Sequence, residues 1–407
     1  MMNRRVVITG MGIVSALGAD VKNAFQRLKK TENLVSKLDE LTQYTGLNSH
    51  LGSLSAFEKP GHWTRKTTRT LGDVAMYALA ASEEAIAQSG LEDLVLSSGR
   101  TGVAYGSCSG SIGAYVDLIS MLDSHEVKNI TSSTYIKLMP QTAACNLSIH
   151  FKTRGRLVPT CTACTSGSLA IGNAYELIKN GVQDVMIAGG AEVFSPTQVA
   201  IFDTLYATSL KNDHPKKTPA PYDINRDGLV IGEGAGTLIL EEYNNAKSRG
   251  AKIYAEVAGF CQNTDGTHAT NPNPETMALA LKGAIEDANI DSSVIGYVNG
   301  HGTATKAGDI AETVATRAIF NRAVPISSTK SYIGHTLGAC GAIEAIATIS
   351  CMNDGWFHPT LNLDDVDSSC ADLDYITGSG RNIDTEYAMS NNFAFGGVNT
   401  SLIFKRV

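Results

Sequence analysis

The chain has 407 residues, of which 43% are hydrophobic and 18% are charged, and its formal net charge is −7. This composition supports a sizeable core and excludes global disorder, and the length allows two domains or one large domain built from two halves. The acidic balance argues against a general nucleic-acid-binding protein, although a local basic patch for one acidic partner is compatible with it. All apolar runs are shorter than the roughly 18–20 residues of a membrane span.

The N-terminal segment VVITGMGIVSALGA follows Arg4 and Arg5 and has the outline of a signal peptide. Thr9, Gly10 and Gly12 interrupt its apolar run, so we interpret it as a buried strand that ends in a glycine turn. Eight cysteines are too few for a disulfide scaffold in a chain of this length. We therefore expect reduced thiols and a cytoplasmic protein.

Short apolar strands alternate with longer amphipathic helices, which is typical of an α/β protein with parallel sheets. The clearest predicted strands are residues 5–9, 101–107, 184–191 and 295–302. The clearest predicted helices are residues 75–90 and 168–181, both of which end at a glycine.

The chain repeats one plan at long range. From Val158 and again from Val324, a valine-proline strand leads into a loop of small residues and then into an apolar helix. A glycine-rich turn into a final strand follows each copy, from Gly232 and from Phe395. Two related halves explain this pattern.

We place the two halves at residues 1–246 and 247–407, with the junction near the segment NNAKSRGA. The stretch from about 109 to 150 has no counterpart in the second half, and we interpret it as an insertion.

The sharpest local motif is TACTSG, which contains Cys164. Cys164 follows a predicted strand and precedes a helix, so free backbone N–H groups and the positive end of the helix dipole should favour its thiolate. Nucleophiles of α/β enzymes use this strand–turn–helix placement. A small buried cysteine without chemistry is the alternative.

Cys161 forms a C-x-x-C with Cys164, which raises the possibility of a redox dithiol or half of a zinc site. The sequence offers no second C-x-x-C or H-x-x-x-H that would complete a tetrahedral zinc site. The two cysteines also straddle a strand end instead of opening a helix together. We expect neither redox nor metal chemistry here.

Two histidines lie among small residues at predicted strand ends. His301 belongs to NGHGTAT, and His335 ends SSTKSYIGH, which occupies the same place in the second half as the cysteine loop in the first. One such histidine is more often structural than catalytic. Two of them, with a cysteine in the matching loop, indicate one shared site.

In chain order, TACTSG, NGHGTAT, SSTKSYIGH and NNFAFGGVN resemble the β-ketoacyl-acyl-carrier-protein synthase I/II family of the thiolase superfamily, over essentially the whole chain. The Cys-His-His set is specific, since synthase III relatives have Cys-His-Asn and thiolases end with a second cysteine. FDTLYATS, RDGLVIGEGAGT, SYIGHTLGAC and GWFHPTLNL more narrowly resemble the synthase of bacterial aryl-polyene pigment pathways. The resemblance implies a five-layered αβαβα thiolase-like fold of two pseudo-symmetric halves, in a homodimer or in a heterodimer with a related subunit.

The resemblance also implies an acyltransferase that performs decarboxylative Claisen condensation. Cys164 would accept an acyl chain from an acyl carrier protein, with the N–H groups of Cys164 and Phe395 as the oxyanion hole. His301 and His335 would donate hydrogen bonds to the malonyl thioester oxygen, and both would stay neutral beside Lys330. The substrates would be attached to 4′-phosphopantetheine as thioesters, and no metal or diffusible cofactor is implied.

Further positions carry over from the family. Lys330 would order the site and pair with Glu312, and a plain structural ion pair is the equal alternative. Thr303 and Thr305 would bind the pantetheine amides, and Phe393 would line the substrate site.

Two departures from the family pattern concern the acyl pocket. Ala394 replaces the usual glycine before Phe395, the family's gate to this pocket, and should stiffen the gate. Ser109 stands where a bulky aliphatic residue often closes the deep end, which predicts a longer or wider channel. The alternative is that Ser109 caps a helix of the insertion and never touches substrate.

Carrier docking is expected on a basic cluster in WTRKTTRT, formed by Arg65, Lys66 and Arg69, because the family docks its acidic partner in this region. An ordinary solvated helix face is an equally good interpretation of these three residues.

Three rival functions remain to be weighed. An NAD-dependent oxidoreductase is suggested by Gly10-Met11-Gly12, but Ser15 stands where the fingerprint needs its third glycine. A chain-length-factor-like partner without chemistry typically lacks the nucleophile that Cys164 provides. A fatty-acid elongation synthase II of primary metabolism differs only in pathway.

Overall fold

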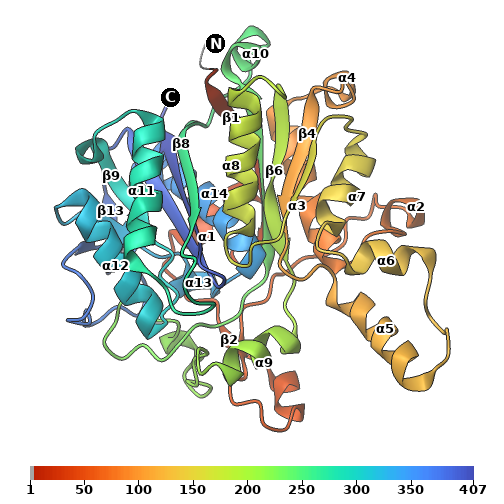
Figure 1. Ribbon diagram of the computed structural model, residues 1–407, viewed down its shortest axis with the longest axis horizontal. Coiled ribbons are helices and arrows are strands. Elements are labelled where there is room, and N and C mark those ends of the chain that lie inside the picture. Colours follow the sequence, from red (N-terminus) through yellow and green to blue (C-terminus); the bar gives the residue numbers. More distant parts are fainter. Residues whose placement is uncertain (1–3) are drawn as a thin grey trace.

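The computed structural model describes residues 4–407 (Figure 1). Its main sheet has the strand order β12-β10-β9-β14-β15-β8-β1-β7-β6-β4-β5. The strands of this sheet are β1 Val6–Ser15, β4 Thr101–Gly106, β5 Leu157–Thr160, β6 Val185–Glu192, β7 Gly234–Glu242, β8 Ala255–Thr264, β9 Ile295–Asn299, β10 Pro325–Ser327, β12 Asp374–Tyr375, β14 Tyr387–Ala394 and β15 Val398–Lys405. Two small sheets pair β2 Ser36–Lys37 with β3 Leu51–Gly52, and β11 Trp356–Phe357 with β13 Arg381–Asn382.

The α-helices are α1 Val21–Leu28, α2 Arg65–Thr68, α3 Asp73–Ser89, α4 Asp93–Leu96, α5 Ile112–Ser124, α6 Ser132–Leu138, α7 Thr142–Phe151, α8 Ser166–Lys179, α9 Pro196–Thr204, α10 Tyr243–Ser248, α11 Pro274–Ala288, α12 Lys306–Phe320, α13 Lys330–Ile333 and α14 Cys340–Asp354. Short 3₁₀ helices are η1 Asp39–Gln43, η2 Pro215–Lys217, η3 Ser292–Val294 and η4 Leu337–Ala339. Within residues 4–407, no helix combines the length and the apolar character needed to cross a membrane.

The main sheet consists of two halves with the same topology. In the first half, β4 is parallel to β5 and β6, and β7 is antiparallel to β6 and β1. In the second half, β9 is parallel to β10 and β14, and β15 is antiparallel to β14 and β8. The halves join through a short antiparallel contact of β1 with β8. The predicted division between residues 246 and 247 falls inside α10.

Five layers follow from this arrangement (Figure 1). α3 covers β1 and β7 on one outer face, and α11 covers β8 and β15 on the other. α8 and α14 pack against each other between the two halves of the sheet, and their residues are largely buried. The predicted thiolase-like fold of two pseudo-symmetric halves is confirmed.

A backbone contact joins the two halves beside α8. A Cβ atom on Gly190, in β6, would lie only 2.2 Å from the carbonyl oxygen of Gly338, in η4. A Cβ atom on Gly338 would in turn lie 2.7 Å from Glu192 Oε2. Only glycine fits at these two positions, since real Cβ atoms do not approach other atoms this closely.

Gly10 and Gly12 do not form the predicted glycine turn. β1 continues through both residues to Ser15 and is buried along its whole length. A Cβ atom on Gly10 would lie 2.0 Å from the carbonyl oxygen of Ala85, and one on Gly12 would lie 1.9 Å from that of Ala81. Both glycines therefore let α3 pack directly on the strand, which explains them without a dinucleotide.

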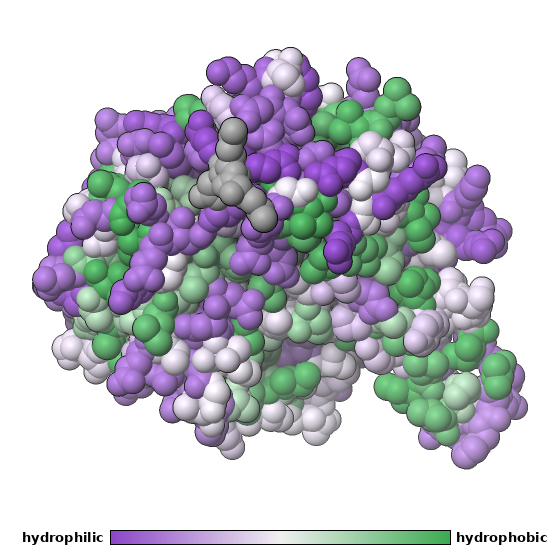
Figure 2. Space-filling model, turned by 45° about the horizontal axis from the view of Figure 1, so that its top comes forward, coloured by the Kyte–Doolittle hydropathy of each residue, from purple (hydrophilic) through white to green (hydrophobic). Residues whose placement is uncertain are grey.

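The predicted insertion corresponds to α5 and α6 between β4 and β5. The prediction is wrong for α7, because α7 packs on α3 as α12 packs on α11 and is therefore the counterpart of α12 in the second half. α5 projects from the body of the molecule (Figure 1). Its lobe carries much apolar surface in Figure 2, and Val116, Ile119 and Leu122 are 60–69% exposed. An apolar face of this kind is typical of an interaction surface.

Candidate active site

Cys164 lies in a tight turn between β5 and α8. Ala163 has a positive φ of 48°, and Thr165 is the N-cap of α8. The Ser166 hydroxyl donates to the carbonyl of Ala163 and accepts from the backbone N–H of Thr162 at 3.0 Å, so the turn is closed by its own side chains. Cys164 itself is 5% exposed. The predicted strand–turn–helix placement of this thiol is confirmed.

The predicted preference of Cys164 for the thiolate is wrong for the free site. Burial raises the pKa of this thiol to about 12, although the charge of Lys330 and the backbone N–H groups of Cys164 and Phe395 lower it. Burial disfavours a charged sulfur more than the turn favours it. The same two N–H groups are those predicted for the oxyanion hole, and both lower the pKa of the thiol.

His301 sits in the loop that follows β9, and Glu312 of α12 holds this loop. The backbone N–H of His301 donates to Glu312 Oε1 at 2.5 Å, and that of Gly302 donates to Oε2 at 2.7 Å. Tyr222 adds a hydroxyl hydrogen bond to Glu312 Oε2 at 3.2 Å. Glu312 therefore fixes the position of the histidine by binding its backbone.

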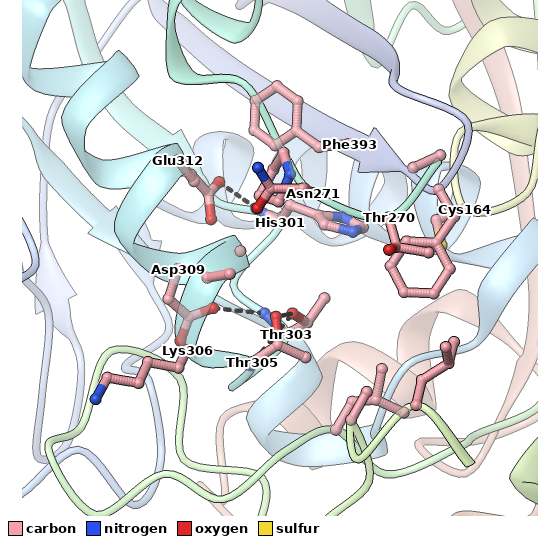
Figure 3. Close-up of a pocket in the computed structure, with 18 of the residues that line it drawn as sticks. Cys164, Thr270, Asn271, His301, Thr303, Thr305, Lys306, Asp309, Glu312 and Phe393 are labelled. Carbon is pink, nitrogen blue, oxygen red and sulfur yellow. Dashed lines mark hydrogen bonds between the residues drawn. The ribbon is translucent and has the colours of Figure 1, made fainter. Parts of the chain in front are cut away.

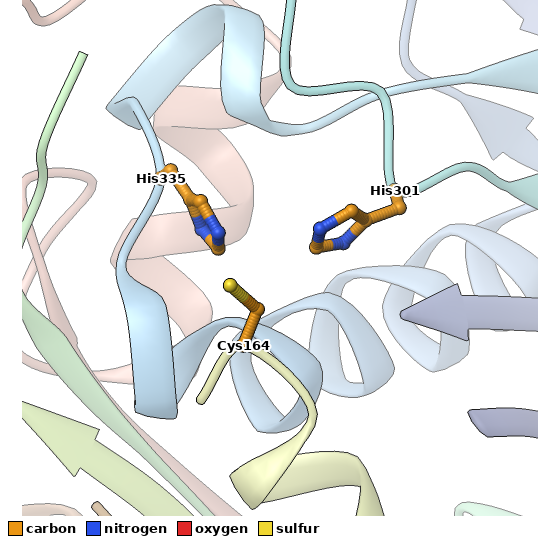
Figure 4. A group of neighbouring side chains, drawn as sticks. All are labelled: Cys164, His301 and His335. Atoms are coloured by element: carbon orange, nitrogen blue, oxygen red, sulfur yellow. The ribbon is translucent and has the colours of Figure 1, made fainter. Parts of the chain in front are cut away.

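His335 reaches the same place from the loop between α13 and η4 (Figure 4). Its ring centroid lies 5.2 Å from that of His301, with the two planes nearly perpendicular at 88°. Cys164, His301 and His335 each offer one ligand-type atom within 4.8 Å of the others. The three predicted residues are thus brought together.

Hydrogen bonds fix the tautomers of both histidines. His301 Nδ1 lies 3.2 Å from Lys330 Nζ and 3.3 Å from Asn392 Nδ2, which are both donors. His335 Nδ1 accepts from the backbone N–H of Leu337 at 3.3 Å. In each ring Nδ1 is therefore the acceptor, and Nε2 carries the hydrogen.

Both rings thus present N–H donors instead of lone pairs. His335 Nε2 is buried and has no hydrogen-bond partner among the residues that the structure describes. Burial and the charge of Lys330 hold the pKa of both histidines well below the usual value, so both are neutral. This arrangement suits an oxygen acceptor between the rings better than a metal ion, which needs lone pairs.

Lys330 pairs with Glu344 of α14, not with Glu312 as predicted. Both side chains are 2% exposed. Glu344 also accepts from Asn392 Nδ2 at 2.6 Å. Burial is the largest single influence on the pKa of Lys330 and lowers it, but the charge and hydrogen bond of Glu344, together with Cys340 and Glu312, keep that pKa above the usual value. The lysine is therefore a fixed cation behind His301.

Replacing Glu344 by glutamine should lower the free energy of unfolding by about 3 kcal/mol, because it leaves a buried ammonium without its counter-charge. In the double variant Glu344→Gln/Lys330→Met, most of that loss should disappear. The loss of stability caused by Glu312→Gln should, in contrast, be the same with and without Lys330→Met. Urea unfolding measures both. Asp213→Asn, which breaks an exposed pair with Lys37, is the control and should cost less than about 1 kcal/mol. Coupling of Lys330 to Glu312 instead of Glu344 would contradict this assignment.

A cavity of about 400 Å³ opens on Cys164. Thr303 and Thr305 line it, with their hydroxyls 2.9 Å apart, and Figure 3 shows them between Lys306 and Cys164. Asp309 holds their loop by accepting the N–H of Thr303 at 3.0 Å. The predicted pantetheine residues therefore lie along the approach to the thiol.

Phe393 and Phe395 also line this cavity. Phe393 is buried at the end of β14, with its ring 6.1 Å from that of His301. Phe395 lies on the turn between β14 and β15 and stacks on Phe202 of α9 at 5.4 Å. Ala394 is the last residue of β14 and pairs with Val398, so its strand geometry does not need glycine.

Ser109 is not among the residues that line the cavity beside Cys164. Its loop lies against a buried carboxylate, because Glu192 accepts the N–H of Cys108 at 2.7 Å, and the N–H of Ser109 lowers the pKa of the same carboxyl. Ser109 does not cap the helix of the insertion, since Ser111 is the N-cap of α5. The prediction of a longer channel therefore finds no support in this cavity.

Arg65, Lys66 and Arg69 are exposed on and just after α2. Figure 1 places α2 on the opposite side of the molecule from α12, whose first residue lines the cavity. The structure does not bring this basic cluster to the cavity of its own chain.

Cys161 is exposed, and its thiol donates to the carbonyl of Cys108 at 3.4 Å. It does not line the cavity that contains Cys164. The two sulfurs of the C-x-x-C thus face different surroundings.

Residues 3–246 match the family described as "Beta-ketoacyl synthase, N-terminal domain", and residues 254–364 match "Beta-ketoacyl synthase, C-terminal domain". This chain belongs to the β-ketoacyl synthase family. The 3-oxoacyl-[acyl-carrier-protein] synthase 2 of Vibrio harveyi is 39% identical over the whole of both chains.

Two solved structures extend the comparison. A β-ketoacyl synthase from Burkholderia phymatum STM815 superposes with a TM-score of 0.98 at 53% identity and covers 99% of this chain and 100% of its own. The ishigamide ketosynthase/chain length factor gives a TM-score of 0.92 at 27% identity, over the whole of both chains.

Sequence reasoning missed several residues of this β-ketoacyl synthase site, namely Glu192, Asp309, Glu344 and Asn392. Glu344 had a visible signal, because it is the one charged residue in the apolar stretch CGAIEAIATIS. A charged side chain in a buried helix needs a partner. Asn392 had a weaker signal within NNFAFGG, since buried amides usually complete hydrogen-bond networks.

Glu192 gives this β-ketoacyl synthase a pH-dependent stability. Burial raises the pKa of this carboxyl to about 7, from an ordinary value of 4.5. The folded state therefore binds the proton more tightly than the unfolded state, and this contribution to stability is lost as pH rises from about 4.5 to about 7. Glu192→Gln keeps an oxygen that accepts from the backbone N–H groups. In this variant the decrease in the free energy of unfolding between low and high pH should be smaller by on the order of 3 kcal/mol. Urea unfolding at pH 5 and pH 8 measures this, and an equal fall in both proteins would contradict it.

Proposed function

We propose that this β-ketoacyl synthase extends carrier-bound acyl chains by decarboxylative Claisen condensation, with Cys164 as nucleophile and His301 and His335 as enolate-stabilising donors. The observation that carries the proposal is the convergence of two neutral imidazole N–H groups beside a buried thiol. A base for the thiol would need a lone pair at this place, and neither ring offers one.

The first half-reaction loads the acyl chain. The sulfur of Cys164 attacks the carbonyl carbon of the acyl thioester, and the N–H groups of Cys164 and Phe395 bind the oxygen of the tetrahedral intermediate. The bond to the pantetheine sulfur then breaks, and the proton of the Cys164 thiol passes to that leaving sulfur. The result is an acyl-cysteine and a free pantetheine thiol.

The second half-reaction makes the carbon–carbon bond. The malonyl carboxylate leaves as carbon dioxide, and its bonding electrons pass to the thioester oxygen as an enolate that His301 and His335 hold. The enolate carbon attacks the acyl-cysteine carbonyl, and the C–S bond to Cys164 breaks to release the elongated β-ketoacyl chain. The bonding electrons leave with the sulfur as a thiolate, which takes up one proton from water to restore the thiol. N–H donors stabilise each developing charge, so these steps need no metal or diffusible cofactor.

A reconstituted assay tests this function. Purified protein, acyl-carrier protein and malonyl-carrier protein should yield a carrier-bound β-ketoacyl product two carbons longer than the primer, detected by mass spectrometry. Carbon dioxide should be released in equal amount. Condensation without carbon dioxide release, or no product with any primer, would refute the proposal.

The pathway proposed for this chain is elongation of an aryl-polyene type chain. The proposal rests on the resemblance of four motifs, FDTLYATS, RDGLVIGEGAGT, SYIGHTLGAC and GWFHPTLNL. Primary fatty-acid elongation is the second candidate, because curated relatives are synthases of type 2. Competition between polyenoyl and saturated carrier-bound primers separates the two, since primary elongation predicts preference for the saturated primer.

A second copy of this chain is the proposed partner of the sheet edge. β5 is the terminal strand of the main sheet, and its Leu157 is 39% exposed. An open strand edge offers backbone groups to another strand, and the apolar lobe of α5 belongs to the insertion that precedes it. Light scattering should give a dimer, and a related subunit in a heterodimer is the alternative outcome. The proposed location is the cytoplasm, and the eight free cysteines support it.

A further inference from the structure

The mouth of the cavity carries exposed apolar side chains on one side. Leu205 and Tyr206 line the cavity, and they are 45% and 93% exposed. Ile201, one helical turn before Leu205, is 58% exposed. These three residues form an apolar lip at the C-terminal end of α9. Such a grouping around a mouth is typical of a contact surface for another molecule.

Backbone hydrogen bonds and the packing of Phe202 fix the position of the apolar lip. The N–H of Tyr206 donates to the carbonyl of Asp203 at 2.9 Å, and the N–H of Ala207 donates to that of Phe202 at 3.0 Å. Tyr206 has a positive φ of 54°, an uncommon conformation for a tyrosine, and its ring stands almost wholly in solvent. Phe202 packs against the buried cluster beneath α9. The tyrosine ring is therefore displayed outward on a fixed turn.

Another element at the cavity, the start of α12, carries a free cation. Lys306, the first residue of α12, is exposed and lines the cavity, and its ammonium has no hydrogen bond or ion pair within residues 4–407. Arg226 also lines the cavity, but it is buried and paired with Asp309 and Asp367. Figure 3 shows the Lys306 side chain running away from Cys164. Lys306 can therefore meet an anion outside the cavity.

From these exposed residues at the cavity we infer that the phosphopantetheinylated carrier protein docks on the apolar lip formed by Ile201, Leu205 and Tyr206, with its phosphate at Lys306. The inference rests on the proposed function. A thioester that reaches Cys164 through this cavity is tethered by its arm to the carrier, so the carrier surface is held against the mouth. The phosphate joins arm to carrier and so lies where an outward-pointing cation can bind it. The partner should accordingly present apolar side chains around its modified serine.

Three substrates separate the parts of this surface. A malonyl N-acetylcysteamine thioester has neither phosphate nor carrier, a malonyl phosphopantetheine thioester has the phosphate alone, and malonyl-carrier protein has both. The double variant Ile201→Ser/Tyr206→Asn should raise KM for the carrier-bound substrate at least tenfold and leave kcat/KM for the other two within twofold. Asparagine is chosen because it tolerates the positive φ at Tyr206.

Lys306→Ala should raise KM severalfold for both phosphate-bearing substrates and weaken its dependence on salt, with no change for the N-acetylcysteamine thioester. Leu94→Ser, at an 80% exposed leucine on α4, is the matched control and should change nothing. An unchanged KM for carrier-bound substrate in the Ile201/Tyr206 variant overturns the docking surface alone. A wild-type protein that decarboxylates and condenses none of the three substrates contradicts the proposed function, and the docking surface with it.

Discussion

Cys164→Ala should abolish transfer of an acyl group to the protein. The turn before α8 places one sulfur next to two backbone N–H groups, and alanine keeps the turn while removing the nucleophile. Intact-protein mass spectrometry after incubation with an acyl-carrier protein should show one added acyl group in the wild type. The variant should show none.

The matched control is Cys161→Ser, since Cys161 lies three residues away but outside the cavity. This variant should load at a rate close to that of the wild type. Peptide mapping of the loaded wild type should place the acyl group on Cys164. An acyl group on Cys161 would show that the assignment of the nucleophile is wrong.

His335→Ala should slow malonyl decarboxylation by about two orders of magnitude or more, as the loss of one oxyanion donor does in other enzymes. Its Nε2–H is buried without a partner among the described residues, so the energy of that unmade hydrogen bond becomes available when the enolate oxygen forms. Release of labelled carbon dioxide from carboxyl-labelled malonyl-carrier protein measures the rate.

Acyl loading of Cys164 in the same His335→Ala protein is the internal control. Loading uses the backbone N–H groups of Cys164 and Phe395, so it should keep most of its wild-type rate. Equal losses in loading and decarboxylation would indicate that His335 positions the thiol. A near wild-type rate of decarboxylation would refute the donor role.

The long-range repeat was enough to predict two related halves, and the family resemblance implied their five-layered fold. A valine-proline strand, a small-residue loop and an apolar helix recur in both halves, and they correspond to β5 with α8 and to β10 with α14. The path of β1 could not be predicted, because Gly10 and Gly12 have the same local signature as a glycine turn. Only the approach of α3, far along the chain, shows that they are packing positions.

The reactive residues of the site could be predicted from their motifs near strand ends. The residues that pair with them could not, because those pairs depend on packing. Cys164 and His301 sit in loops directly after β5 and β9, and His335 follows β10 beyond the short helix α13, so the topology brings them together. The partner of Lys330 could not be read from spacing, because Glu312 and Glu344 lie on different helices and both are buried. The choice depends on which helix passes behind the lysine.

The balance of forces on the thiol was also beyond sequence reasoning. A helix start favours a thiolate, and that effect is visible in the motif. Burial opposes it by an amount that depends on the atoms around the sulfur, which come from both halves of the chain. The sign of the pKa shift at Cys164 is therefore a property of the assembled site.

The close approach of Gly190 and Gly338 bears on how this enzyme can be recombined. Symmetric halves invite chimeras, in which the first half of one synthase is fused to the second half of another. Here the seam between halves has no side chains to absorb a mismatch, since backbone meets backbone within a few residues of Glu192 and the nucleophile's helix. If a fusion shifted one strand by a fraction of an ångström, this shift would move the backbone that holds the thiol. Crossover points should therefore be chosen in the outer helices and the insertion. The segments around Gly190 and Gly338 should both come from the same parent synthase.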